Sequence, residues 1–387
     1  MKNGFVALAL TCACGVFGMA GACAQTQGIT KDQVLLGYPN DLSGPVAEVG
    51  RSVQNGVRLA EEEINAAGGV FGRKLKILVE DNGYDPKKSL LVTQKLVQQD
   101  KVFAIVMATG TAPAAAALPM VLKAGIPHVC PTTAALMFST PLEHLGFGCY
   151  PTNGGMMAGG LRYFMEKEKK TRFCAIYQDD DFGAEVLEAT EKQLALGKLK
   201  LIESVGYKRG ATDYSAQVAR VQGANCDTLL LISTVPPTAA IMQEVQRRNW
   251  KIPVVAAATA YDESLLKLGK DAVEGMYAAS FVGTPNDEQA PAPVKEWVKR
   301  YQAKFGVPPT VSSTYGYMFT NVIAEGMRLA GPDLTVESFI KGMESMKNFK
   351  TVFGATFGFS PTSHLGAANG GFLYRVEGGV WKLVGNL

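Results

Sequence analysis

The amino-acid sequence predicts an α/β protein built from two doubly wound lobes, each with a parallel sheet. Its 387 residues exceed what a single hydrophobic core usually holds, so two domains are expected. Short apolar segments alternate with segments whose apolar residues recur at helical spacing, which is typical of parallel strands covered by helices on both faces. The alternation restarts after the turn-forming segment 151–155, which separates the strands of the two lobes.

The first half of the chain contains four predicted strands. They are residues 34–38, 75–80, 102–107 and 126–130. Between the first two, Val53, Val57 and Ile64 recur at helical spacing and predict an amphipathic helix. Asp85 and Pro86 open the next helix, with Asp85 as the N-cap and Pro86 as the first helical residue.

The second half repeats this organisation. Its predicted strands are residues 173–177, 199–207, 228–232 and 254–257. Helices such as 216–221 and 239–248 separate them. The segment 284–293 is rich in proline and in acidic or small residues, which predicts a linker. Two further helices are expected after it, at 294–305 and 315–329.

Residues 1–24 predict a cleaved secretory signal peptide. A short basic start precedes the apolar segment 5–19, and Ala22-Cys23-Ala24 provides the small residues of a cleavage site. The mature chain would begin at Gln25 in the periplasm. Two alternatives are a buried N-terminal element and a lipid-anchored form at Cys23, because residues 20–23 faintly resemble a lipoprotein box.

The overall composition is that of an ordinary globular protein, with 47% hydrophobic and 19% charged residues. A net charge of +3 is too small to indicate a nucleic-acid partner. Beyond the N-terminus, the sequence contains no uninterrupted apolar segment long enough to span a bilayer.

Sequence motifs of common enzymes are missing. The chain has no phosphate-binding loop, no dinucleotide fingerprint, no nucleophile elbow and no zinc-protease motif. His128 falls inside an apolar strand, while His144 and His364 show no metal-ligand spacing. The acidic residues 179–181 are interpreted as helix-capping residues rather than as a cation site. We therefore expect no enzymatic activity, no cofactor and no metal.

Two strand ends of the first lobe carry hydroxyl groups. In an open parallel sheet, ligands bind beyond the carboxyl ends of the strands, where helix N-termini present unpaired N–H groups. The strands that end at Met107 and Cys130 run into such positions, which predicts a place for a carboxylate. The alternative is that these threonines only cap helices. The residues concerned are Thr109, Gly110, Thr111, Thr132, Thr133 and Ala134.

The second lobe offers a matching edge. Phe182 follows the strand 173–177, and Thr234 follows the strand 228–232 shortly before Pro236 and Pro237. Two such edges facing each other across a hinge would form a cleft.

Several segments together resemble a known family. Residues 37–47, Gly-Tyr-Pro-Asn-Asp-Leu-Ser-Gly-Pro-Val-Ala, are similar to the opening of periplasmic leucine/isoleucine/valine-type binding proteins, the type I solute-binding proteins of ABC transporters. The similarity continues through nearly the whole mature chain. It is carried by residues 60–70, 80–86, 125–127, 131–134 and 181–183.

This resemblance implies a Venus-flytrap fold whose lobes are joined by three hinge strands. Lobe 1 would comprise 25–151 and 282–356, and lobe 2 would comprise 152–281 and 357–387. A monomer is expected. A small ligand would close the lobes, and the closed form would dock on the permease subunits of an ABC transporter.

The resemblance also assigns site residues. It places the hydroxyl for the ligand carboxylate on Thr111 and a second cluster on residues 132–134. The aromatic residue of the family's acid-x-x-Tyr-Gly motif is Phe182 here, and a second aromatic position falls on Thr234. The acidic residue that pairs with a ligand's amino group falls on Ala258, beside Thr259.

The alanine at position 258 changes the predicted ligand. A buried ammonium group without a carboxylate partner costs several kcal/mol. We therefore predict a small organic acid, aromatic acids included, rather than a zwitterionic amino acid. Binding of amides or urea, and a soluble sensor that presents its ligand to a separate membrane receptor, are the alternatives.

Four cysteines remain after signal cleavage, and they suggest disulfides in an oxidising compartment. Three connectivities are possible, and four free buried thiols are the alternative. With the lobes arranged as the resemblance implies, Cys130 and Cys149 lie near the ends of neighbouring strands and are predicted to pair. Cys174 and Cys226 also fall on neighbouring strands, although their depths along the strands match less closely.

Overall fold

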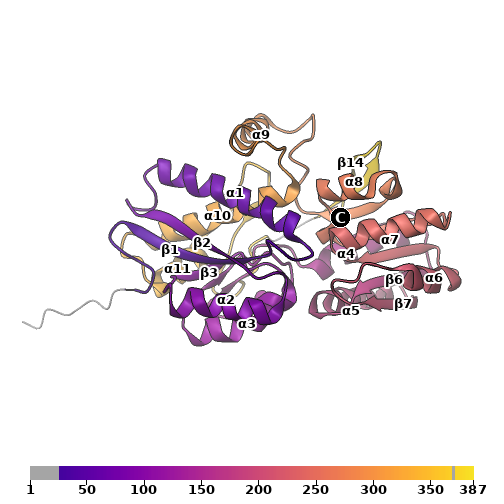
Figure 1. Ribbon diagram of the computed structural model, residues 1–387, viewed down its shortest axis with the longest axis horizontal. Helices are drawn as coiled ribbons and strands as arrows, with labels where there is room; N and C mark the ends of the chain where they lie inside the picture. Colours follow the sequence, from indigo (N-terminus) through magenta and orange to yellow (C-terminus); the bar gives the residue numbers. More distant parts are fainter. Residues whose placement is uncertain (1–25, 368–370) are drawn as a thin grey trace, which may run out of the picture.

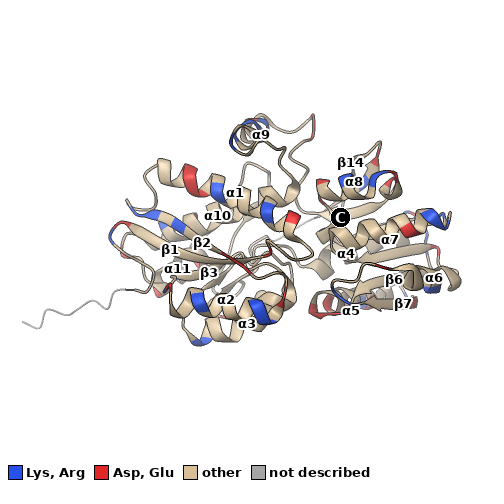
Figure 2. Ribbon diagram, in the orientation of Figure 1, with Lys and Arg blue, Asp and Glu red and all other residues tan. Residues whose placement is uncertain are grey.

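The computed structural model describes residues 26–367 and 371–387 and shows two α/β lobes (Figure 1). The predicted fold class is confirmed. The predicted signal peptide and Cys23 lie outside the described residues. None of the helices within the described ranges is long and apolar enough to cross a membrane. Lysine, arginine, aspartate and glutamate are distributed over both lobes, in keeping with the small net charge (Figure 2).

The first lobe is built on a five-stranded parallel sheet in the order β2-β1-β3-β4-β5. Helix α1 packs on α10, and α10 on α11, while α2 packs on α3. Figure 1 shows α1 and α10 on the opposite side of this sheet from α2 and α3. The strands are β1 Gln33–Asn40, β2 Lys74–Asp81, β3 Ala104–Val106, β4 His128–Val129 and β5 Gly146–Phe147. The helices are α1 Ala47–Ala66, α2 Pro86–Gln98, α3 Thr111–Lys123, α10 Val311–Ala330 and α11 Val336–Ser345.

The second lobe has a seven-stranded sheet in the order β14-β13-β10-β9-β8-β6-β7. Its central strands are parallel, and every residue of β8 is buried because helices cover both faces. The strands are β6 Phe173–Gln178, β7 Leu201–Tyr207, β8 Thr228–Ile232, β9 Val254–Ala256, β10 Tyr277–Ser280, β13 Phe372–Glu377 and β14 Val380–Asn386. The helices are α4 Asn153–Glu166, α5 Asp181–Leu196, α6 Ser215–Gly223, α7 Val235–Arg247 and α8 Glu263–Gly269.

Two features of this sheet were not predicted. Strands β13 and β14 pair antiparallel through a turn at Gly378 and Gly379, and β13 also runs antiparallel to β10. Both glycines have positive φ angles, which a tight hairpin turn favours. The hairpin therefore adds an antiparallel edge to an otherwise parallel sheet.

The chain passes between the lobes three times, before α4, between β10 and α10, and before β13. Helix α9, Ala292–Phe305, packs against α1 of the first lobe after the second passage. A short antiparallel pair, β11 Phe349–Lys350 and β12 Thr356–Phe357, precedes the third passage. The lobe boundaries at 151/152, 281/282 and 356/357 stay a prediction.

Each lobe contains one disulfide. Cys130 and Cys149 follow the neighbouring strands β4 and β5, and their Cα atoms are 4.7 Å apart. Cys174 lies in β6, Cys226 precedes the adjacent strand β8, and their Cα atoms are 5.9 Å apart. In both cases neighbouring parallel strands bring together cysteines that are distant in sequence.

Candidate functional site

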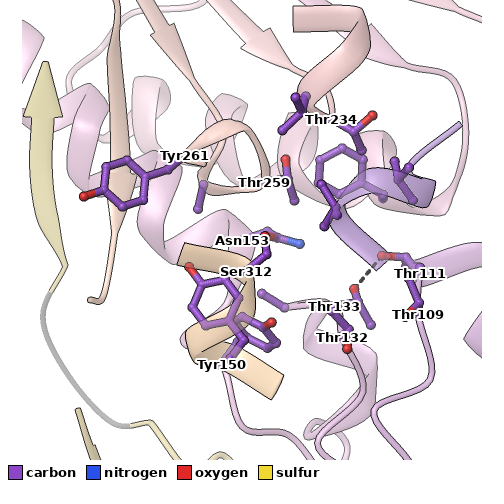
Figure 3. A pocket seen from close by; sticks show the side chains of 18 of the residues that line it. Thr109, Thr111, Thr132, Thr133, Tyr150, Asn153, Thr234, Thr259, Tyr261 and Ser312 are labelled. Carbon is purple, nitrogen blue, oxygen red and sulfur yellow. Dashed lines mark hydrogen bonds between the residues drawn. The ribbon is translucent and has the colours of Figure 1, made fainter. Parts of the chain in front are cut away.

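A pocket lies between the two lobes, where the carboxyl ends of both sets of strands face each other (Figure 3). It encloses about 830 Å³, including space open to solvent. This volume is in the range of small-molecule sites. All ten residues predicted from the sequence line it. They are Thr109, Gly110, Thr111, Thr132, Thr133 and Ala134 from the first lobe, and Phe182, Thr234, Ala258 and Thr259 from the second.

A pair of hydroxyl groups lies at the start of helix α3. The hydroxyl oxygens of Thr111 and Thr133 are 2.6 Å apart, and Figure 3 shows the two side chains pointing toward each other. Helix α3 begins at Thr111 without a side-chain cap. Its first N–H groups and the positive end of its dipole are therefore available to an acceptor in the pocket. This arrangement suits a carboxylate.

The hydroxyl groups of three other threonines form hydrogen bonds within the pocket wall. The hydroxyl of Thr109 donates to Oδ1 of Asn40 over 2.9 Å, and that of Thr132 donates to the carbonyl of Met107 over 3.0 Å. In the second lobe the hydroxyl of Thr259 donates to the carbonyl of Ser233 over 2.9 Å. The hydroxyl protons of these three residues are thus used within the protein, and only their oxygens could accept from a ligand. Thr234 stands at the N-cap position of α7, yet its side chain caps no helical N–H group.

Aromatic rings form a large part of the wall, and sequence reasoning missed most of them. Phe281 and Tyr315 stack with centroids 5.5 Å apart, and Tyr150 meets them edge-on at 5.5 and 5.1 Å. These three residues lie in the passages between the lobes and in α10. The only local signal is a preference for aromatic residues in binding sites, which does not single them out.

Asn153, also not predicted, supplies a polar group at the pocket. It is the first residue of α4, and its side chain is 3% exposed. Within the described ranges, its side-chain amide has no hydrogen-bond partner in the protein. It can therefore donate to or accept from a ligand.

The pocket is electrically neutral. Among the described residues that line it, none carries a charged side chain. Burial raises the pKa of Tyr150 and Tyr315 well above the usual phenol value, so both remain neutral hydrogen-bond donors. Ala258, the position at which the family resemblance predicts the carboxylate partner of an amino group, also lines this pocket.

Hydrogen bonds join the two lobes, which indicates that the structure is a closed form. Asp262 Oδ2 accepts from the backbone N–H and the hydroxyl of Ser312, at 3.0 and 2.6 Å. Glu263 Oε2 accepts from the backbone N–H of Val311 at 2.7 Å. In a third contact between the lobes, Glu185 Oε2 accepts from the backbone N–H of Leu136 at 2.9 Å. Closure of this kind sequesters a ligand between two lobes.

Comparison with known proteins identifies the class. The model of the periplasmic binding protein family matches residues 33–380, so the chain belongs to that family, as the sequence resemblance predicted. The Leu/Ile/Val-binding protein homolog 1 of Brucella abortus is 26% identical over 330 residues, which cover 83% of this chain and 85% of that protein.

Solved structures share the fold. The substrate-binding protein of a branched-chain amino acid transporter from Streptococcus pneumoniae, in complex with isoleucine, has a TM-score of 0.78 at 21% identity. That alignment covers 92% of this chain and 99% of that chain. A solute-binding protein from R. palustris in complex with benzoate has a TM-score of 0.80 at 19% identity. That alignment covers 92% of this chain and 96% of that chain. Relatives of this fold thus bind different small molecules and serve transport.

Proposed function

We propose that this protein is the periplasmic substrate-binding component of an ABC importer of the branched-chain amino acid type, and that its ligand is a small carboxylate with an apolar, preferably aromatic, body. The observation that carries the proposal is the neutral, aromatic-rich pocket with an uncapped helix start at Thr111. The carboxylate would accept from the first N–H groups of α3 and from the Thr111–Thr133 hydroxyl pair. The apolar body would lie against Tyr150, Phe281 and Tyr315.

An ammonium group has no counter-charge in this pocket. Desolvating it without a carboxylate partner costs several kcal/mol, which lowers affinity by a factor of about 100 or more. The benzoate complex of the R. palustris relative supports an amine-free aromatic acid, and the isoleucine complex of the S. pneumoniae relative marks the alternative.

Isothermal titration calorimetry on refolded, ligand-free protein tests the proposal with matched ligands. Phenylalanine and 3-phenylpropanoate differ only by the α-amino group, and so do leucine and 4-methylpentanoate. We expect the amine-free acid of each pair to bind at least about 100-fold more tightly. Tighter binding of both amino acids would reject the ligand class while leaving the transport role in place.

A further inference from the structure

The structure assigns a further role to Tyr84: its ring joins the carboxylate end of the pocket to the second lobe, so that it couples ligand binding to lobe closure. This inference rests on the proposed function, because it concerns the same pocket. Tyr84 was not among the predicted site residues, and it lies in the loop between β2 and α2 of the first lobe. It lines the pocket and is 6% exposed.

The backbone holds Tyr84 in an unusual conformation. Its φ angle is +56°, in the left-handed region that non-glycine residues rarely adopt. The buried side chain of Asn82 fixes this turn, since its Oδ1 accepts from the N–H of Tyr84 at 2.9 Å and its Nδ2 donates to the carbonyl of Thr109 at 3.0 Å. The turn that carries Tyr84 is therefore tied to the loop that begins α3.

The ring of Tyr84 lies directly against the start of α3. A Cβ atom on Gly110 would fall 2.5 Å from Cε2 of Tyr84, and the φ angle of Gly110 is +92°. Only glycine lets the ring approach this closely. The ring therefore lies beside the N–H groups that are proposed to receive the carboxylate.

The same ring reaches residues of the second lobe. The guanidinium carbon of Arg209 lies 5.7 Å from the ring centroid, within cation–π distance. Nη1 of Arg209 is buried without a hydrogen-bond partner and lies 3.9 Å from Oδ2 of Asp180. That oxygen accepts from Nε2 of Gln178 at 2.7 Å.

These contacts exist only when the lobes are closed, because Tyr84 and Arg209 belong to different lobes. A ligand that fixes the start of α3 also fixes the ring that Arg209 packs on. Opening the cleft removes Arg209 from the ring and exposes one side of the pocket. Loss of this contact should therefore act mainly on ligand release, since closed-state contacts govern dissociation.

A double-mutant cycle tests the coupling. The variants are Tyr84→Ala, Arg209→Met and the double variant, with 3-phenylpropanoate as ligand in calorimetry and stopped-flow experiments. We expect each single substitution to weaken affinity about tenfold through faster dissociation, and the double variant to be no weaker than the worse single variant. Tyr84→Phe keeps the ring and should stay within about threefold of wild type. Fully multiplicative losses in the double variant would overturn the inference.

The chain offers a matched control. The guanidinium carbon of Arg375 lies 5.4 Å from the ring centroid of Tyr277, and both residues belong to the second lobe and are absent from the pocket wall. Tyr277→Ala and Arg375→Met should lower stability without changing ligand dissociation.

If wild type binds phenylalanine and not 3-phenylpropanoate, the proposed ligand class fails. The cycle is then run with phenylalanine, so that the two conclusions are decided separately.

Discussion

The substitution Glu263→Gln should make the stability of this protein less dependent on pH. Glu263 is the first residue of α8, and its carboxylate accepts from Val311 N–H of the first lobe and from the hydroxyl of Thr284. Burial, helped by the negative charge of Asp262, raises the pKa of Glu263 from 4.5 to about 7. A glutamine keeps the shape of the protonated acid and removes the buried charge.

The direction of this pH dependence follows from the difference between the folded-state and unfolded-state pKa values of Glu263. The folded-state pKa lies above the unfolded value, so the folded protein holds the proton more tightly between pH 4.5 and 7. The resulting stability is fully present below pH 4.5 and is lost as the pH rises through 7. A shift from 4.5 to about 7 corresponds to at most about 3 kcal/mol.

Denaturant unfolding from pH 4 to pH 8.5 measures this effect. We expect Glu263→Gln to equal wild type at pH 4 and to exceed it at pH 8 by about 1–3 kcal/mol. Asp262→Asn is the control, because Asp262 Oδ2 accepts two hydrogen bonds from Ser312 that an amide N–H₂ cannot accept. At low pH, where Glu263 is protonated, this substitution should cost about 2 kcal/mol or more. Parallel pH profiles for wild type and Glu263→Gln would refute the reasoning.

Three further predictions concern the pocket and the disulfides. Ala258→Asp should restore a partner for an amino group, so phenylalanine should gain affinity relative to 3-phenylpropanoate by about tenfold or more in calorimetry; an unchanged ratio would contradict it. Thr111→Val removes one hydroxyl of the 2.6 Å pair and should weaken binding of 3-phenylpropanoate about tenfold, whereas unchanged affinity would place the carboxylate elsewhere. Replacing Cys174 and Cys226 by alanine should cost about 2–4 kcal/mol in denaturant unfolding, and a midpoint equal to that of wild type would count against a stabilising bridge.

Local patterns predicted the parts of the site that depend on one strand and the turn after it. Thr111 and Thr133 follow successive strands of a parallel sheet, and the carboxyl ends of such strands share one edge, so the strand pattern alone predicts that these residues meet. The strand ends of the second lobe likewise predicted Phe182 and Thr234, and the family resemblance added Ala258 and Thr259. All of these residues line the pocket.

The remaining pocket residues were not predicted, because they meet only when segments far apart in the chain pack together. Tyr150, Phe281 and Tyr315 come from passages between the lobes and from a helix late in the chain, and no short pattern links them. Tyr84 depends on a left-handed turn held by Asn82 and on the space left by Gly110.

The sequence alone therefore determined the alternation of strands and helices, the presence of two α/β lobes, and the strand-end residues of the cleft, because these depend on periodicity and on rules that act within a few residues. Only the tertiary structure decided the aromatic wall, the neutral interior of the pocket, and the contacts of Tyr84 and Glu263 across the lobes. Those features arise when segments far apart in the chain are buried against each other, and burial is a property of the folded molecule.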